Sequence, residues 1–201
     1  METHSDRPDV RLAACARLPS RFGEFEVWAF ECRDDGLDYG VMVRGDLQGA
    51  EGVPVRLHSE CFTGDVMGSL KCDCRDQLEA ALGYIGGVER GAVLYLPQEG
   101  RGIGLANKMR AYSLQDQGFD TVEANHRLGF EDDERDFRLG AAILKKLGFS
   151  SVRLLTNNPA KVRMMEAMGI AVAERVPLKV GRTAHNAGYL ATKARKSGHL
   201  L

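Results

Sequence analysis

The stretch SVRLLTNNPAKVRMMEAMG, residues 151–169, decides how the second half of the chain folds. Its first five residues form a short, mostly apolar run that indicates a strand, and the remainder is typical of a polar loop that opens a helix. Asn158 suits the N-cap of that helix and Pro159 its first position. Lys161 falls in the first turn, where free backbone N–H groups attract phosphate. The stretch therefore predicts a strand and a helix joined by a polar loop, which is either an anion site or an ordinary capped helix with a solvent-facing lysine.

A second strand-to-helix crossing, residues 92–118, has the same layout. The apolar run AVLYL leads into PQEGRGIG and then into the helical segment LANKMRAYSLQDQG. In α/β sheets ligands bind beyond the carboxyl ends of strands, so both crossings are candidate binding loops. The segment GRGIG is weak evidence by itself, because it lacks the G-x-G-x-x-G spacing of a dinucleotide loop.

Residues 10–60 follow a different pattern, an alternation of apolar and polar residues with a period of two. Turn residues interrupt it, which predicts a series of antiparallel strands: VRLAACA, EFEVWAFEC, YGVMVRG and VPVRLHSE. With 201 residues and 44% hydrophobic content, the chain can bury one good-sized core. We therefore expect a mixed α/β fold in which antiparallel N-terminal strands precede an alternating helix/strand half. This single compact domain would span residues 10–201, after a disordered tail at residues 1–9.

The charge and hydropathy of the chain indicate which partners and which location to expect. The chain has 27 basic and 28 acidic residues, so nothing in its overall charge favours nucleic acid or an anionic membrane as a partner. It contains no run of about eighteen apolar residues, and its first ten residues, METHSDRPDV, are polar. These features predict neither a membrane span nor a secretory signal, and we expect a cytoplasmic location and a small-molecule partner.

Three of the five cysteines, Cys61, Cys72 and Cys74, lie within fourteen residues in the spacing C-x10-C-x-C. An odd number of cysteines in a chain without a leader argues against a disulfide framework, and clustered thiols indicate metal or redox chemistry. Cys15 and Cys32 lie in apolar, strand-like surroundings and are interpreted as small hydrophobic residues.

A metal site with three thiols raises two questions, the number of its ligands and its charge. Three ligands leave a fourth position open, as in a catalytic zinc site, although His58 as a fourth ligand would close it and a site without metal also remains open. Three thiolates exceed the charge of one zinc ion, so cationic groups and a nearby acid or base must assist. Glu60, Asp133 and Arg135 are candidates for these roles.

Four blocks of sequence carry a family resemblance: RLHSECFTGDVMGSLKCDCRDQLEAAL, PQEGRGIGLANKMRAYSLQDQGFDTVEANHRLGFEDDERDF, VRLLTNNPAKV and YLATKARKSGHLL. Together they resemble GTP cyclohydrolase II, the enzyme family that opens the imidazole ring of GTP at the start of riboflavin synthesis. The resemblance extends from about residue 11 to the end of the chain.

The resemblance implies a reaction and its cofactors. Cys61, Cys72 and Cys74 match the family's three ligands of one catalytic Zn²⁺, with the fourth position left for water that attacks C8 of guanine. The opened ring would lose formate, and pyrophosphate would leave the triphosphate with Mg²⁺ assisting. The product would be 2,5-diamino-6-(5-phosphoribosylamino)pyrimidin-4(3H)-one, and the protein would be a homodimer.

The resemblance also implies site residues. Asp133 matches the family's proton acceptor, Arg135 its nucleophile toward the α-phosphorus, and Tyr112 a tyrosine beside the substrate ring. Because a guanidinium keeps its proton up to about pH 12, Arg135 also suits a phosphate clamp, and Tyr112 also fits an apolar position of an amphipathic helix. The positions that match nucleotide-binding residues are Arg56, Leu57, His58, Ser59, Glu60, Gln77, Glu99, Gly100, Arg101, Thr121, Thr156 and Lys161.

Three alternatives accompany this interpretation. The zinc nucleobase deaminases share an H-x-E element, but their P-C-x-x-C spacing is absent here. A non-catalytic zinc module would bind GTP without turnover and would gain support if His58 were a fourth ligand. A ring-opening enzyme could also retain the formyl group or supply a specialised pathway.

Overall fold

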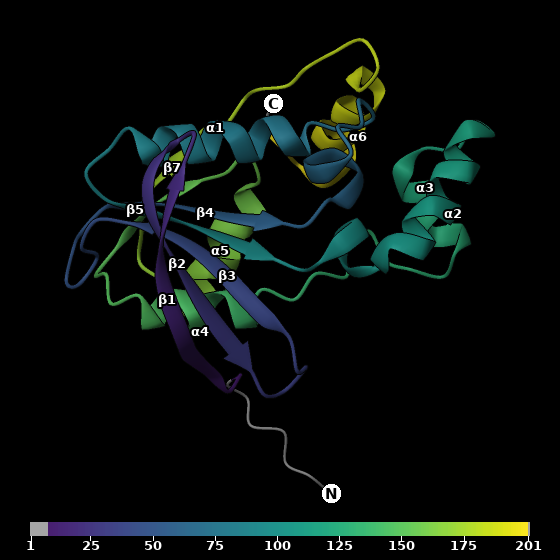
Figure 1. Cartoon of the computed structure of the whole chain (residues 1–201). Helices are drawn as coiled ribbons and strands as arrows, with labels where there is room; N and C mark the ends of the chain where they lie inside the picture. Colours follow the sequence, from purple (N-terminus) through teal and green to yellow (C-terminus); the bar gives the residue numbers. More distant parts are fainter. Residues whose placement is uncertain (1–7, 201) are drawn as a thin grey trace, which may run out of the picture.

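The computed structural model describes residues 8–200 and contains one mixed sheet of seven strands, in the order β1-β2-β3-β5-β4-β6-β7 (Figure 1). The strands are β1 (Val10–Ser20), β2 (Gly23–Cys32), β3 (Asp38–Arg44), β4 (Val53–Ser59), β5 (Gly91–Leu96), β6 (Val152–Leu155) and β7 (Val172–Val176). β1, β2, β3 and β5 pair antiparallel, whereas β5, β4, β6 and β7 pair parallel. The predicted mixed α/β class is confirmed, whereas residues 1–7 of the tail predicted at residues 1–9 lie outside the described residues.

One strand departs from the prediction of an antiparallel N-terminal half. β4 lies parallel to both β5 and β6 in the middle of the sheet. Every residue from Val53 to His58 is buried, as expected for a central parallel strand that is covered on both faces. The prediction was wrong on this point because an alternating pattern marks a strand but does not fix the direction of its neighbours.

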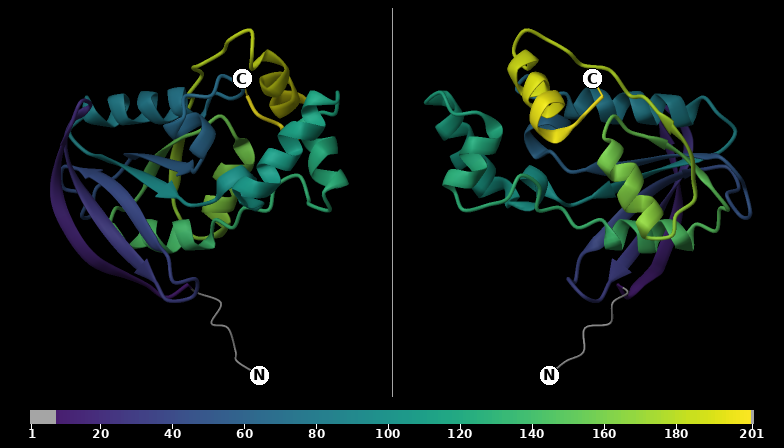
Figure 2. Two further views of the ribbon diagram at one scale, coloured as in Figure 1. Left: turned by 45° about the vertical axis from the view of Figure 1, so that its right-hand side comes forward. Right: turned by 180° about the vertical axis from the view of Figure 1, so that it is seen from behind.

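Helices cover both faces of the sheet (Figure 2). They are α1 (Cys74–Gly86), α2 (Gly104–Asp116), α3 (Thr121–Arg127), α4 (Arg138–Lys146), α5 (Pro159–Ala167) and α6 (Ala187–Ser197), with short turns η1 (Phe62–Val66) and η2 (Glu99–Gly102). α1 packs Leu82 and Ile85 on one face, next to Val93. α4 and α5 pack on the other face, where Phe137, Ile143 and other apolar residues join the main core.

Two local predictions are confirmed at α5. The Asn158 side chain accepts a hydrogen bond from the Ala160 N–H at 2.9 Å, and Pro159 occupies the first helical position. A crossover helix that starts directly after β6 returns the chain to the parallel part of the sheet. The carboxyl ends of β4, β5 and β6 therefore meet at one edge, and the loops that follow them share one space. Within the described residues, no helix has the length and apolar character needed to cross a membrane.

Candidate active site

Three cysteine sulfurs meet beside the carboxyl end of β4. Cys61 follows that strand, Cys74 begins α1, and the three sulfur atoms lie within 4.8 Å of one another. The Cys61 and Cys72 sulfurs are 3.7 Å apart. Tetrahedral zinc with bonds of about 2.3 Å to sulfur would hold its ligands about 3.8 Å apart, so the spacing fits. A metal ion could therefore be held by these three thiols.

Gly64 makes room for this cluster. A Cβ atom at this position would lie 2.8 Å from the Cys72 sulfur and 3.1 Å from the Cys61 sulfur. Both separations are shorter than ordinary contacts, so any side chain here would push the sulfurs apart. The turn η1, which carries Gly64, is thus shaped around the position that a metal would take.

His58 does not join the cysteines. Its Nε2 atom lies 3.0 Å from Asp65 Oδ2, and Tyr95 donates a hydrogen bond to the same oxygen at 2.9 Å. Burial lowers the pKa of His58, and among the described residues only the three cysteines form a metal-holding group of His, Cys, Asp or Glu side chains. The geometry therefore favours an open three-thiol site over one closed by His58.

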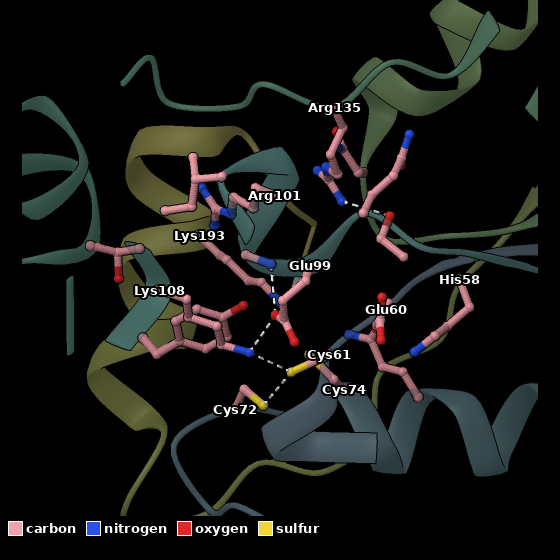
Figure 3. A pocket seen from close by; sticks show the side chains of 18 of the residues that line it. His58, Glu60, Cys61, Cys72, Cys74, Glu99, Arg101, Lys108, Arg135 and Lys193 are labelled. Atoms are coloured by element: carbon pink, nitrogen blue, oxygen red, sulfur yellow. Dashed lines mark hydrogen bonds and ion pairs between the residues drawn. The ribbon is translucent and has the colours of Figure 1, made fainter. Parts of the chain in front are cut away.

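A buried lysine offsets the charge of the thiols. Lys108 of α2 donates hydrogen bonds to Glu99 Oε1 at 2.7 Å and to the Cys61 sulfur at 3.1 Å (Figure 3). Burial alone would lower the pKa of Lys108, but Glu99 and the Cys61 thiolate outweigh it and raise the pKa. Glu99 also accepts a hydrogen bond from the Phe62 N–H at 2.6 Å, which connects the loop after β5 to the cysteine turn, residues 61–74.

Tyr112 of α2 lines the same pocket as the cysteines. The Lys71 ammonium is 4.9 Å from the centre of its ring and that of Lys108 is 5.7 Å away. Burial raises the pKa of Tyr112 to about 12, and the charge of Lys108 opposes this only in part. The phenol therefore keeps its proton near neutral pH and can donate a hydrogen bond to a ligand.

The opposite end of the pocket is strongly basic, with Arg101 and Arg135 away from the cysteines in Figure 3. Arg135 donates to Asp133 through two nitrogens, at 2.7 and 2.5 Å, and also to Ser59 Oγ at 3.3 Å. Lys161 is buried and donates to the Leu57 carbonyl at 3.1 Å. Burial, followed by repulsion from Arg135, lowers its pKa well below that of an ordinary lysine. The two guanidinium groups suit a polyanionic ligand, whose negative charge would favour the protonated form of Lys161.

Backbone geometry in η2 connects Arg101 to the loop that carries Arg135. Arg101 has a φ of 62°, and it is the one residue other than glycine with a positive φ in the described part of the chain. Its carbonyl accepts from the Glu134 N–H at 3.0 Å, and its guanidinium donates to the Asp132 carbonyl at 3.2 Å. Such strain often marks a functional site, because the surrounding contacts must hold the residue in place.

Most residues implied by the resemblance line one cavity, whose space is about 1130 Å³ including the part open to solvent. Leu57 and Asp133 are the exceptions: the Leu57 side chain is buried in the core, and Asp133 reaches the site only through Arg135. The implied residues that line the cavity are Arg56, His58, Ser59, Glu60, Cys61, Cys72, Cys74, Gln77, Glu99, Gly100, Arg101, Tyr112, Thr121, Arg135, Thr156 and Lys161.

Several lining residues were not predicted: Lys71, Lys108, Asn125, Asn157, Tyr189, Lys193 and His199. None stands in a spacing that marks a ligand. A single lysine on a helix is usually a solvated residue, and only the tertiary structure shows that Lys108 and Lys193 are buried.

Comparison with known proteins identifies the family of this chain. The sequence profile of the family described as GTP cyclohydrolase II matches residues 11–177. The chain belongs to the GTP cyclohydrolase II family. It is 56% identical over 192 residues to the GTP cyclohydrolase-2 of Cronobacter sakazakii, covering 96% of this chain and 98% of that protein. The GTP cyclohydrolase-2 of Escherichia fergusonii is also 56% identical, with 96% and 97% covered, and that of Salmonella typhimurium is 55% identical, with 96% and 98% covered.

Membership of the GTP cyclohydrolase II family confirms the predicted family and enzyme class. One solved structure, a two-domain 3,4-dihydroxy-2-butanone 4-phosphate synthase from A. baumannii, aligns with 77% of this chain and 35% of its own at 18% identity and a TM-score of 0.40. The family profile ends at residue 177. Tyr189, Lys193 and His199, which complete the wall of the cavity, therefore lie beyond the matched region.

Proposed function

We propose that this protein is a zinc-dependent GTP cyclohydrolase II. It opens the imidazole ring of GTP at C8 and releases formate and pyrophosphate. The product is 2,5-diamino-6-(5-phosphoribosylamino)pyrimidin-4(3H)-one, formed in the first step of riboflavin synthesis. One observation carries the proposal: three thiols at the spacing of zinc ligands share a cavity with a cluster of buried cations.

The thiol end of the cavity has the groups that ring opening requires. Zinc held by the three cysteines would supply an activated water and a Lewis acid. Lys108 offsets the excess negative charge of the thiolates. Burial and the neighbouring Glu99 raise the pKa of Glu60, which makes its carboxylate a better proton acceptor than an exposed glutamate. Tyr112 donates a hydrogen bond to the ring or to the formyl group as it forms.

The basic end binds the triphosphate. Arg101, Arg135 and Lys161 surround this part of the cavity, and Mg²⁺ accompanies the phosphates. Burial alone would raise the pKa of Asp133, but the hydrogen bonds from Arg135 outweigh it, so the carboxylate is ionised as a proton acceptor must be. The same bonds keep the guanidinium charged and oriented, which supports a phosphate clamp better than a nucleophile for Arg135.

Other parts of the proposal come from family membership and composition. We propose a homodimer in the cytoplasm that binds GTP, with neither nucleic acid nor membrane as a partner. The formal net charge of −1 is consistent with the last point.

A pair of cysteine variants tests the proposal. Cys72→Ser removes a thiol of the cluster, whereas Cys32→Ser changes a buried cysteine in the sheet core that is not part of it. Both proteins are assayed for bound zinc, and for formate and pyrophosphate released from GTP with Mg²⁺. Cys72→Ser should lose zinc and formate release, and Cys32→Ser should keep both. Normal formate release by Cys72→Ser would overturn the assignment of the metal site.

The products of the unaltered protein separate the alternatives. Formate, pyrophosphate and a diaminopyrimidine are expected in equal amounts. A nucleotide that keeps its formyl group would indicate an enzyme that stops after ring opening. Bound but unchanged GTP would indicate the non-catalytic module, and ammonia would indicate a deaminase.

A further inference from the structure

Asp73 is a buried carboxylate placed between two of the metal-site cysteines. It stands at the N-cap of α1, yet its side chain makes no capping hydrogen bond to that helix. One of its oxygens instead accepts a hydrogen bond from Lys193 Nζ at 2.9 Å, and the other accepts one from Gln77 Nε2. The carboxylate therefore joins α1, through the Gln77 side chain, to Lys193 of α6 in place of the backbone capping bond that its position favours.

Lys193 reaches this carboxylate from the far end of the sequence. It lies on α6, 120 residues from Asp73, and the two side chains are only 10% and 2% exposed. The ring of Tyr189 lies 4.5 Å below its ammonium. Figures 1 and 2 show α6 beside the end of α1 that carries Cys74.

Asn157 forms hydrogen bonds at both ends of the segment 178–200, which carries Lys193. Asn157 donates to the Leu178 carbonyl at 2.7 Å and accepts from the Leu178 N–H at 2.8 Å. Its own carbonyl accepts from the Leu200 N–H at 2.9 Å. Gly198, with a φ of 65°, ends α6 and lets the chain turn back toward Asn157. α6 therefore has a defined place against the cysteine turn.

Charge explains why the pair matters. The cysteine turn carries three thiols whose sulfurs lie within 4.8 Å of one another, together with the buried Asp73 carboxylate, and one divalent ion cannot neutralise all four groups. Without Lys193, the buried Asp73 carboxylate would lose its ion-pair partner and keep only the hydrogen bond from Gln77, which is strongly unfavourable. The turn would then rotate the carboxylate toward water and move Cys72 and Cys74 with it.

We propose that Lys193 is a positioning residue of the metal centre, which fixes the turn between Cys72 and Cys74 through its ion pair with Asp73. Metal binding and the docking of α6 then stabilise each other, since coupling between two events is reciprocal. This inference rests on the zinc centre proposed above and not on the identity of the substrate.

Zinc affinity of the purified protein, measured by competition with a chromogenic chelator, tests the proposal without any catalytic assay. Lys193→Met should weaken zinc binding about 10-fold to 100-fold, the usual effect of removing a partner behind the ligands. Lys193→Arg should restore most of the affinity, because it keeps the charge. Lys146→Met, at an exposed lysine of α4 that does not line the cavity, should bind zinc as the unaltered protein does.

Two further measurements, on Asp73→Asn variants and on hydrogen exchange in α6, distinguish a loss of this ion pair from a general loss of folding. Asp73→Asn keeps the size and the contact with Gln77 but removes the ion pair. It should also weaken zinc binding, and adding Lys193→Met to it should cost little more. Hydrogen exchange of the α6 amides should slow when zinc binds to the unaltered protein and should not change in Asp73→Asn.

The outcomes are distinct. If the unaltered protein binds no zinc, the proposed function itself fails. If Lys193→Met binds zinc with unchanged affinity but binds GTP more weakly, Lys193 is a phosphate ligand and the positioning role is overturned. If Lys193→Met only lowers the melting temperature and leaves zinc affinity unchanged, the ion pair is a structural contact and the inference is equally overturned.

Discussion

Single residues decide the chemistry of the cysteine turn. The spacing of the thiols predicted the metal-holding group, because C-x10-C-x-C is visible in the sequence. The cation beside it was not predictable: Lys108 lies 47 residues from Cys61 in the sequence, and only the approach of α2 to η1 brings its ammonium to that sulfur. The sequence thus predicts metal ligands more readily than the residues that balance the charge of those ligands.

Gly64→Ala should weaken zinc binding by at least 10-fold. The added methyl group would meet the Cys72 and Cys61 sulfurs at 2.8 and 3.1 Å and would force them away from tetrahedral spacing. The measurement is chelator competition. Gly83→Ala in α1, where the nearest atom to a new Cβ is 3.9 Å away, is the control and should leave affinity unchanged. Equal affinity of Gly64→Ala and the unaltered protein would contradict the geometry of the site.

Tyr112→Phe should slow the release of formate more than the opening of the ring. The phenol keeps its proton because burial raises its pKa to about 12, so its contribution is that of a hydrogen-bond donor. Quenched time courses that follow GTP loss and formate separately would show a formylated nucleotide accumulating. Equal slowing of both steps would argue against a selective role for the hydroxyl.

The start of a helix was easier to predict than the elements against which a strand or helix packs. The cap and first turn of α5 follow from local chemistry at Asn158 and Pro159, and both are confirmed. The direction of β4 does not follow from its own residues, because it depends on pairing with β5 and β6, which come later in the chain. The position of α6 was likewise inaccessible, since Asn157 holds it through contacts with Leu178 and Leu200.

Asn157→Ala should lower the free energy of unfolding by about 2 kcal/mol or more. It removes two hydrogen bonds to Leu178 and leaves that residue's buried N–H and carbonyl unsatisfied. Urea unfolding followed by circular dichroism measures the change. Asn107→Ala is the control: its amide donates to the Ile103 carbonyl and accepts from the exposed Arg110 within the same helix region, and its loss should cost less than about 1 kcal/mol. A loss no larger than that of the control would mean that Asn157 does not hold the C-terminal segment.

At the scale of the molecule, the cavity is assembled from segments that are far apart in sequence. The loops after β4, β5 and β6 meet because parallel strands end at one edge, and this part of the site follows from the predicted strand-to-helix crossings. The wall built by Tyr189, Lys193 and His199 does not, because it depends on how the last helix folds back over the sheet edge.

Stability should fall as the pH is lowered from 7.5 to 5.5. Burial, reinforced by Lys193 and Arg101, lowers the pKa of His199 to about 3, and burial also lowers that of His58. In the unfolded chain both imidazoles take up a proton below about pH 6.5. In the folded protein His199 stays neutral over this range, and His58 takes up its proton less readily than in the unfolded chain. Protons therefore stabilise the unfolded state in this window, and the stabilising contribution present above pH 6.5 is lost as the pH falls.

Urea unfolding at the two pH values tests this pH dependence. His199→Gln should show a smaller loss of unfolding free energy between pH 7.5 and 5.5 than the unaltered protein. His126→Gln, at an exposed imidazole that contacts Asp132, is the control and should keep the full loss. A pH dependence that is the same in all three proteins would show that His199 does not titrate as the structure indicates.

The central claim is that this cavity opens the guanine ring of GTP at C8 and removes that carbon. The most direct test is to incubate the zinc-loaded protein and Mg²⁺ with GTP labelled with carbon-13 at C8, and to follow the label by nuclear magnetic resonance. We expect the label to leave the purine and appear in free formate, in the same amount as the pyrophosphate released. A label that stays in the purine, or in a formyl group on the nucleotide, would contradict the claim.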